Sequence, residues 1–253
     1  MSPRGLGAAG LAICATLAAA ASEPVPEGVS PAPPEPAAAA PASLGAIRLD
    51  RAQRTFVVPG RFLERDPGAP HDLLEYLAVK RDGYKAYEAV LELETTATAF
   101  NLACILIGLD PDNARLPAHH FDPRPVQGDP VELWIEWEQD GATRRIRPAE
   151  LVVVEGEPSD DHHWVYTGST FTAPESYLAE QTGTLIGFVH DQDSIIEHRN
   201  GIGLGAPHPP TVNRALLPPE GTGVRLVVRS LAGTDESTPA TPAQPGTTTP
   251  APR

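Results

Sequence analysis

An aspartate–glycine pair flanked by alternating apolar and polar residues constrains the fold of this chain more than any other feature. Asp140-Gly141 separates Val131–Trp137 from Thr143–Arg147. Asp-Gly favours a two-residue β-hairpin turn because both of its residues tolerate positive φ. The alternation predicts antiparallel strands with one buried face. The expected cross-strand pairs are Glu136 with Arg145, Ile135 with Ile146, and Trp134 with Arg147.

A second pair, Asp82-Gly83, predicts another hairpin, between Leu73–Val79 and Tyr84–Leu93. With a two-residue loop, Glu75 and Glu88 share an apolar face, and their repulsion raises the pKa of one of them. Such a pair is a candidate for acid–base catalysis or for metal binding. A three-residue loop with a bulge would place them on opposite faces. Each acid can also simply meet a basic partner or water.

One strongly apolar segment predicts a single buried helix over residues 97–109. Thr96 is its expected N-cap and Gly108 its expected C-terminal cap, while Pro111 prevents the helix from continuing. The stretch TAFNLACILI has no polar face, which is typical of a helix buried on all sides. Asn101 is its one polar interior residue. We expect its side chain to bond to the backbone, or alternatively to serve a binding site.

The remaining strand candidates supply the sheet against which this helix is expected to pack. They cover residues 47–49, 55–58, 151–154, 163–167, 184–189 and 223–230, and Pro59-Gly60 is expected to end the second of them. Helices do not alternate regularly with strands, which argues against a doubly wound parallel sheet. We therefore predict an α+β fold with mostly antiparallel sheet, two Asp-Gly hairpins and one buried helix.

The two ends of the chain differ in composition from its middle. Arg4, an apolar run and small residues up to Ala21 predict a cleavable signal peptide over residues 1–21, and hence export to the periplasm or beyond. An uncleaved anchor is an alternative. Lipidation at Cys14 is another, although Ile13 is larger than such a site prefers. Residues 22–43 are rich in Pro and Ala and residues 232–253 in Thr, Pro and Ala, so both are expected to be disordered. One globular domain over residues 44–231 remains.

Composition excludes several classes of partner. A net charge of −14 argues against nucleic acid and against anionic lipid headgroups. After signal cleavage no stable transmembrane span is expected, and Cys104 is left without a disulfide partner, so it is expected to be a core thiol. The chain contains no HExxH, CxxC or P-loop motif, and no cofactor is predicted.

Histidines and tryptophans supply the other candidate site residues. His163, His190 and Asp191 have suitable side chains for a divalent metal, but their spacing matches no known metal site, and surface or loop histidines are the alternative. Trp134 and Trp164 are candidates for stacking on sugars or peptides. The alternatives are a stack on Arg147 for Trp134 and a core position for Trp164.

Six segments in order resemble the YdjY-domain family, a group of bacterial exported proteins without an established biochemical role. They are LLEYLAV (73–79), YEAVLEL (87–93), LACILIGLDP (102–111), WVYTGSTF (164–171), GTLIGFVHDQDSI (183–195) and PPEGTGVRLVV (218–228). The family pattern carries His where this chain has Asn101, so any function of that His would be lost here. The resemblance implies an exported domain and says little about its chemistry.

Three functions are therefore carried forward. The first is a non-catalytic exported domain that binds a partner or polymer at the cell envelope, supported by the linker–domain–tail layout and the lack of catalytic motifs. The second is a carboxylate- or metal-dependent hydrolase of the envelope that uses the acids and histidines named above. The third is a structural spacer domain.

Overall fold

The computed structural model describes residues 42–63, 74–208 and 210–233. The predicted signal peptide, Leu73, and most of the predicted linker and tail lie outside these residues. Ala42 and Ser43, which we assigned to the linker, instead belong to the first strand, β1 (Ala42–Leu44). Within the described residues, no helix is long and apolar enough to cross a membrane.

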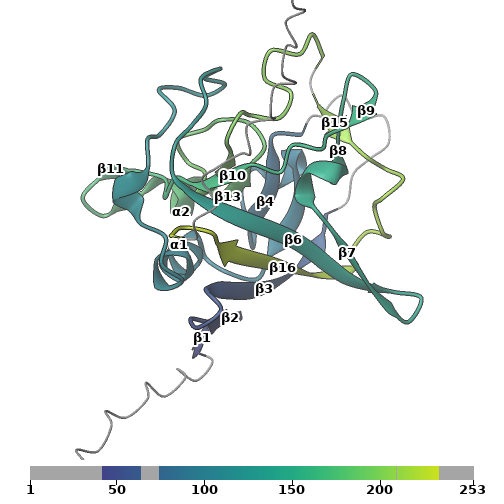
Figure 1. Cartoon of the computed structure of the whole chain (residues 1–253), viewed down its shortest axis with the longest axis horizontal. Coiled ribbons are helices and arrows are strands. Elements are labelled where there is room, and N and C mark those ends of the chain that lie inside the picture. Colours follow the sequence, from purple (N-terminus) through teal and green to yellow (C-terminus); the bar gives the residue numbers. More distant parts are fainter. Residues whose placement is uncertain (1–41, 64–73, 209, 234–253) are drawn as a thin grey trace, which may run out of the picture. The chain divides into compact units, whose positions relative to one another are not determined.

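Eight strands close into a barrel. Their order around it is β3, β16, β6, β10, β14, β13, β4, β5 and back to β3. Their bounds are β3 Thr55–Phe62, β4 Tyr76–Lys80, β5 Ala89–Leu93, β6 Asp129–Gln139, β10 Trp164–Tyr166, β13 Thr184–Gly187, β14 Ile196–His198 and β16 Gly223–Ser230. Figure 1 shows three of these strands, β3, β16 and β6, side by side.

The α+β prediction is wrong, because the fold is mostly β and the barrel sheet is closed and mixed. Two neighbouring pairs, β4–β5 and β13–β14, run parallel, and the other neighbours around the barrel run antiparallel. A closed sheet leaves its strands no free edge. The sequence pattern shows which residues form strands, but it does not show that the first and last strands of a sheet meet.

Closure depends on β3, which divides one of its edges between two partners. Its first half pairs with β2 (Ile47–Asp50), and its second half pairs with β5. Pro59 was expected to end this strand, but it lies where the partner changes, and its carbonyl accepts from Glu94 N at 2.8 Å. Proline is tolerated in a strand where no ladder N–H is required.

The predicted Asp82-Gly83 hairpin does not form, because β4 and β5 are parallel neighbours. A type I′ turn needs positive φ at both central residues, and only Asp82 (φ 57°) has it. Gly83 is buried beside Gly183, and Lys80 N donates to the Gly183 carbonyl at 2.8 Å. Residues 81–88, including η1 (Ala86–Glu88), therefore run back to the start of β5.

The Asp140-Gly141 hairpin is confirmed, with the register predicted from the sequence. Asp140 (φ 53°) and Gly141 (φ 76°) both have positive φ. They join β6 to β7 (Ala142–Ile146), and Gln139 pairs with Ala142. Glu136 lies opposite Arg145 and Ile135 opposite Ile146.

The helix α1 (Ala97–Leu106) has Thr96 as its N-cap, as predicted, and the Thr96 side chain accepts from Ala99 N. It packs Phe100 edge-on against Phe56 of β3 with ring centroids 5.2 Å apart, and Cys104 is fully buried in the same core. It is not buried on all sides, since Leu102 and Ile105 are each 42% exposed. Continuous apolarity therefore overstated the burial of this helix.

Short elements complete the described residues. They are η2 Pro111–Asn113, η3 Pro148–Leu151, β8 Val152–Val154, β9 Glu157–Pro158, β11 Phe171–Ala173, β12 Ser176–Tyr177, α2 Leu178–Thr182 and β15 Thr211–Val212.

Gly60 tests the closure of the barrel. A Cβ atom at this position would lie 2.3 Å from the Glu92 carbonyl oxygen of β5, so Gly60→Ala should lower the free energy of unfolding by about 1–3 kcal/mol, as overpacking does. Gly223→Ala in β16 is the matched control, because its Cβ would meet nothing within 4 Å. Urea unfolding of both variants measures the difference. Equal stabilities would contradict this account of the β3–β5 contact.

Candidate functional site

A buried ionic network lies where β4 meets the loops 81–88 and 188–195. The Tyr76 hydroxyl donates to Asp191 Oδ2 at 2.5 Å and accepts from Lys85 Nζ. Lys85 Nζ also lies 2.8 Å from Asp191 Oδ2 and 3.1 Å from Asp193 Oδ2. All of these side chains are at least four-fifths shielded from solvent. The network therefore ties two loops to one strand of the barrel.

The titratable groups in this network have shifted pKa values. Burial raises the pKa of Tyr76, and the charge of Asp191 adds to this effect. Burial alone would lower the pKa of Lys85, but its hydrogen bond to Asp191 and the charges of Asp193 and Asp191 outweigh burial and raise it. Burial alone would raise the pKa of Asp191, but its hydrogen bonds with Asp193, Lys85 and Tyr76 outweigh burial and lower it. The pKa of Asp193 is raised by burial and by its contact with Asp191. One lysine thus faces two carboxyls of different acidity.

Glu197 of β14 lies beside this network, and among the described residues it has no charge partner. Its Oε1 accepts from Asp191 N at 2.6 Å, and within the described residues its Oε2 is buried without a hydrogen-bond partner. Burial raises the pKa of this carboxyl well above its ordinary value. Uncompensated burial of the charged form is the physical cause.

Two mostly shielded glutamates, Glu75 and Glu88, and the partly exposed His120 lie next to the network. Glu75 N donates to the Glu88 carbonyl at 3.2 Å, which brings the two side chains near each other. Burial, and then the charge of Glu75, raises the pKa of Glu88. His120 Nε2 lies 3.1 Å from Glu75 Oε2, and this hydrogen bond raises the pKa of His120.

Exposed aromatic rings flank this acid pair. Tyr84 (78% exposed) and Tyr87 (55% exposed) meet edge to face, and Tyr87 directly precedes Glu88 in the chain. On the other side, Phe121 (47% exposed) stacks on His120 with ring centroids 3.8 Å apart. We call these six residues the aromatic–acid surface: Glu75, Tyr84, Tyr87, Glu88, His120 and Phe121.

His190 holds the loop that carries His120 and Phe121. It is fully buried, with Nδ1 2.6 Å from the Asp122 carbonyl and Nε2 3.1 Å from the His198 carbonyl. Phe121 N donates to the His190 carbonyl at 3.0 Å, and Phe121 adopts a φ of 59°, which is rare for an aromatic residue. These contacts fix the position of the exposed ring.

The structure brings together three of the residues proposed from the sequence, Glu75, Glu88 and Asp191. The acid pair arises from parallel neighbouring strands rather than from the predicted hairpin. The network also contains residues that sequence reasoning missed: Tyr76, Lys85, His120, Asp193 and Glu197. Tyr76 and Glu197 carry a weak signal, because each places a polar group next to apolar residues, in YLAV and IIEH; the other three lie in polar loop sequences that carry none.

The candidate metal ligands have separate partners. His163 Nδ1 lies 2.5 Å from Asp161 Oδ1, the ring of His190 faces backbone carbonyls, and Asp191 contacts Lys85 and Tyr76. In the part of the chain that the structure describes, no group of three or more His, Cys, Asp or Glu side chains is placed to hold a metal ion.

The remaining candidates lie away from the aromatic–acid surface. Trp134 is stacked by Arg147 at 3.7 Å and by Arg145 at 4.3 Å. Trp164 is a core residue, 2% exposed. Asn101 Oδ1 accepts from the Tyr166 hydroxyl at 2.7 Å, so its partner is a side chain rather than the backbone.

The fold and site define a small closed β-barrel domain with an exposed aromatic–acid surface. The YdjY domain model matches residues 47–229, so the chain belongs to the YdjY-domain family, as its sequence segments indicated. Neither the curated proteins nor the solved structures gave a match. Family membership does not identify a reaction or a ligand, so the function must be inferred from the residues of the site.

Glu197 predicts a pH dependence of stability. Its pKa is raised in the folded state, so the unfolded chain binds fewer protons than the folded chain between the ordinary value of 4.5 and the folded pKa. This group therefore lowers stability as pH rises through that window. Glu197→Gln should lose less stability than the unchanged chain between pH 5 and pH 8, measured by urea unfolding. Glu138→Gln, at an exposed position, is the control, and identical slopes in both variants would contradict the assignment.

Proposed function

We propose that this chain is an exported domain that binds a sugar polymer of the cell envelope without catalysis. The observation that carries the proposal is the aromatic–acid surface, where three solvent-exposed rings flank Glu75 and Glu88. Clustered exposed apolar groups rimmed by polar residues are typical of binding sites. The ionic network beneath them would hold the surface rigid in the free state.

Sugar recognition suits these side chains. Ring faces pack on the apolar faces of pyranose rings, and carboxylates accept hydrogen bonds from hydroxyl groups. Glu88 with a raised pKa could also donate one. The rings of Tyr84 and Phe121 lie on opposite sides of the acid pair in the chain of contacts, which suits an extended ligand.

Export supports an envelope ligand. The signal-like residues 1–21 and the Pro/Ala-rich segment that follows are the basis for placing the domain outside the cytoplasm. The net charge of −14 argues against polyanionic partners such as nucleic acid.

Removal of the two tyrosine rings tests the proposal. A Tyr84→Ala/Tyr87→Ala double variant of the full chain should bind muramidase-released peptidoglycan fragments at least about tenfold more weakly, which corresponds to about 1.4 kcal/mol. Stability should hardly change, because both rings are exposed. Calorimetric titration gives the affinity.

Phe171→Ala is the matched control, since Phe171 is 62% exposed and belongs to β11. Equal affinities for the double variant and the control would contradict sugar binding at this surface. Absence of binding by the unchanged chain would favour a structural spacer.

A hydrolase is the second candidate, favoured by the raised pKa of Glu88 beside Glu75 and His120. In this function Glu88 would serve as the proton donor and Glu75 as the carboxylate. Glu88→Gln should then abolish release of reducing ends from peptidoglycan while leaving fragment binding within about threefold. If the unchanged chain releases no reducing ends, the hydrolase is excluded and the binding function is untouched.

A further inference from the structure

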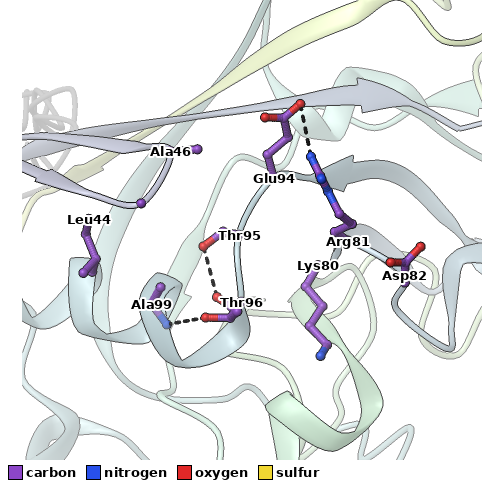
Figure 2. A pocket seen from close by; sticks show the side chains of 10 residues that line it. Leu44, Ala46, Lys80, Arg81, Asp82, Glu94, Thr95, Thr96 and Ala99 are labelled. Atoms are coloured by element: carbon purple, nitrogen blue, oxygen red, sulfur yellow. Dashed lines mark hydrogen bonds and ion pairs between the residues drawn. The ribbon is translucent and has the colours of Figure 1, made fainter.

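A cleft lies between the start of β2 and the end of β5, the two strands that share one edge of β3, and it is separate from the site described above. It lies between the tip of the β1–β2 hairpin, the end of β4 and the start of α1, and has a volume of about 610 Å³ (Figure 2). This volume lies within the range of small-molecule sites. Its lining residues are Leu44, Gly45, Ala46, Lys80, Arg81, Asp82, Glu94, Thr95, Thr96 and Ala99.

The two sides of the cleft differ in chemistry. Figure 2 shows Leu44, Ala46 and Ala99 on one side, and Arg81 with Glu94 on the other. The apolar side is built from one leucine and two alanines, so it can pack against small apolar groups of a ligand. Thr96 Oγ1 accepts from Ala99 N at 3.1 Å and keeps its own hydrogen for another acceptor.

The two cations that line the cleft differ in how closely they are paired with carboxylates. Lys80 Nζ is held by Glu180 Oε1 at 2.8 Å. Arg81 touches Glu94 through a single 3.5 Å contact, and the two side chains are 60% and 52% exposed. Such an exposed pair contributes little stability and opens at small cost. Arg81 therefore keeps most of its donors for an incoming anion.

The cleft continues past this ion pair. A second hollow of about 320 Å³ shares Arg81, Asp82 and Glu94 with the first and adds Gly60, Arg61 and Glu92. Arg61 is paired with Glu92 Oε1 through two of its nitrogen atoms, at 3.0 and 3.1 Å. An elongated ligand can thus lie along both hollows, with Arg81 as the available cation near the middle.

We propose that this cleft binds the free carboxylate end of a short peptide with small apolar side chains. Arg81 would take the carboxylate in a bidentate contact, Thr96 would donate to a carbonyl oxygen, and Ala46 and Ala99 would pack on the side chains. The neighbouring carboxylates of Asp82 and Glu94 would repel a doubly charged phosphate more than a single carboxylate. The site shares no residue with the aromatic–acid surface, so it does not depend on the sugar-binding proposal.

Titration of the isotope-labelled full chain with acetyl-Ala-Ala-Ala, as the free acid and as the C-terminal amide, tests this proposal by NMR. The free acid should shift the amide signals of Ala46, Arg81 and Thr96, and the amide should bind at least about tenfold more weakly. Arg81→Gln should weaken binding of the acid by a similar factor. Glu94→Gln should strengthen it about threefold, because it removes the competing carboxylate.

Arg225→Gln is the matched control, since Arg225 is a half-exposed arginine that pairs with Glu136 on another strand, and it should change nothing. Opposite effects of the Arg81 and Glu94 variants cannot come from loss of folding. Equal binding of acid and amide, an unaffected Arg81→Gln variant, or no shifts at millimolar peptide would each overturn the proposal.

Discussion

The division of one β3 edge between two partner strands is the constraint on which the barrel depends. Val57 pairs with Arg48 of β2, and three residues later Gly60 pairs with Leu93 of β5. Pro59 lies where the partner changes, and because proline has no backbone N–H it requires no acceptor there. Gly60 has no side chain, which leaves room for the β5 backbone. Barrel closure and the cleft beside it are thus two results of one local arrangement.

The polar network has a different physical basis from the core. Tyr76 belongs to a small cluster with Val79 and Ala89, separate from the main apolar core. Its hydroxyl, Lys85 and Asp191 satisfy one another where water is largely excluded, and in such surroundings each partner needs the others. The same loops carry the exposed rings of Tyr84 and Tyr87, so the buried charges and the proposed ligand surface are mechanically joined.

Strand pairing could be predicted from the sequence where a single turn determines the register, but pairing between distant segments could not. Asp140-Gly141 gave the correct register because both residues adopt positive φ. The same dipeptide at 82–83 misled because Gly83 is instead packed against Gly183 from a distant segment. The run Tyr76–Val79 is buried at every position, and an uninterrupted apolar run of this kind is typical of a parallel strand.

Of the site, Glu75 and Glu88 could be named from the sequence because acids in apolar runs are unusual, and Asp191 because its carboxylate follows His190 and suits a metal ion. Lys85 and His120 could not, because only the fold brings their loops together. The topology also sets an order of assembly. Strand β3, near the start of the domain, needs β16, its last strand, along seven residue pairs. Contacts that join distant segments form late. A chain that emerges from a ribosome or a membrane pore N-terminus first must therefore keep β3 unpaired on that edge until its final strand has passed through.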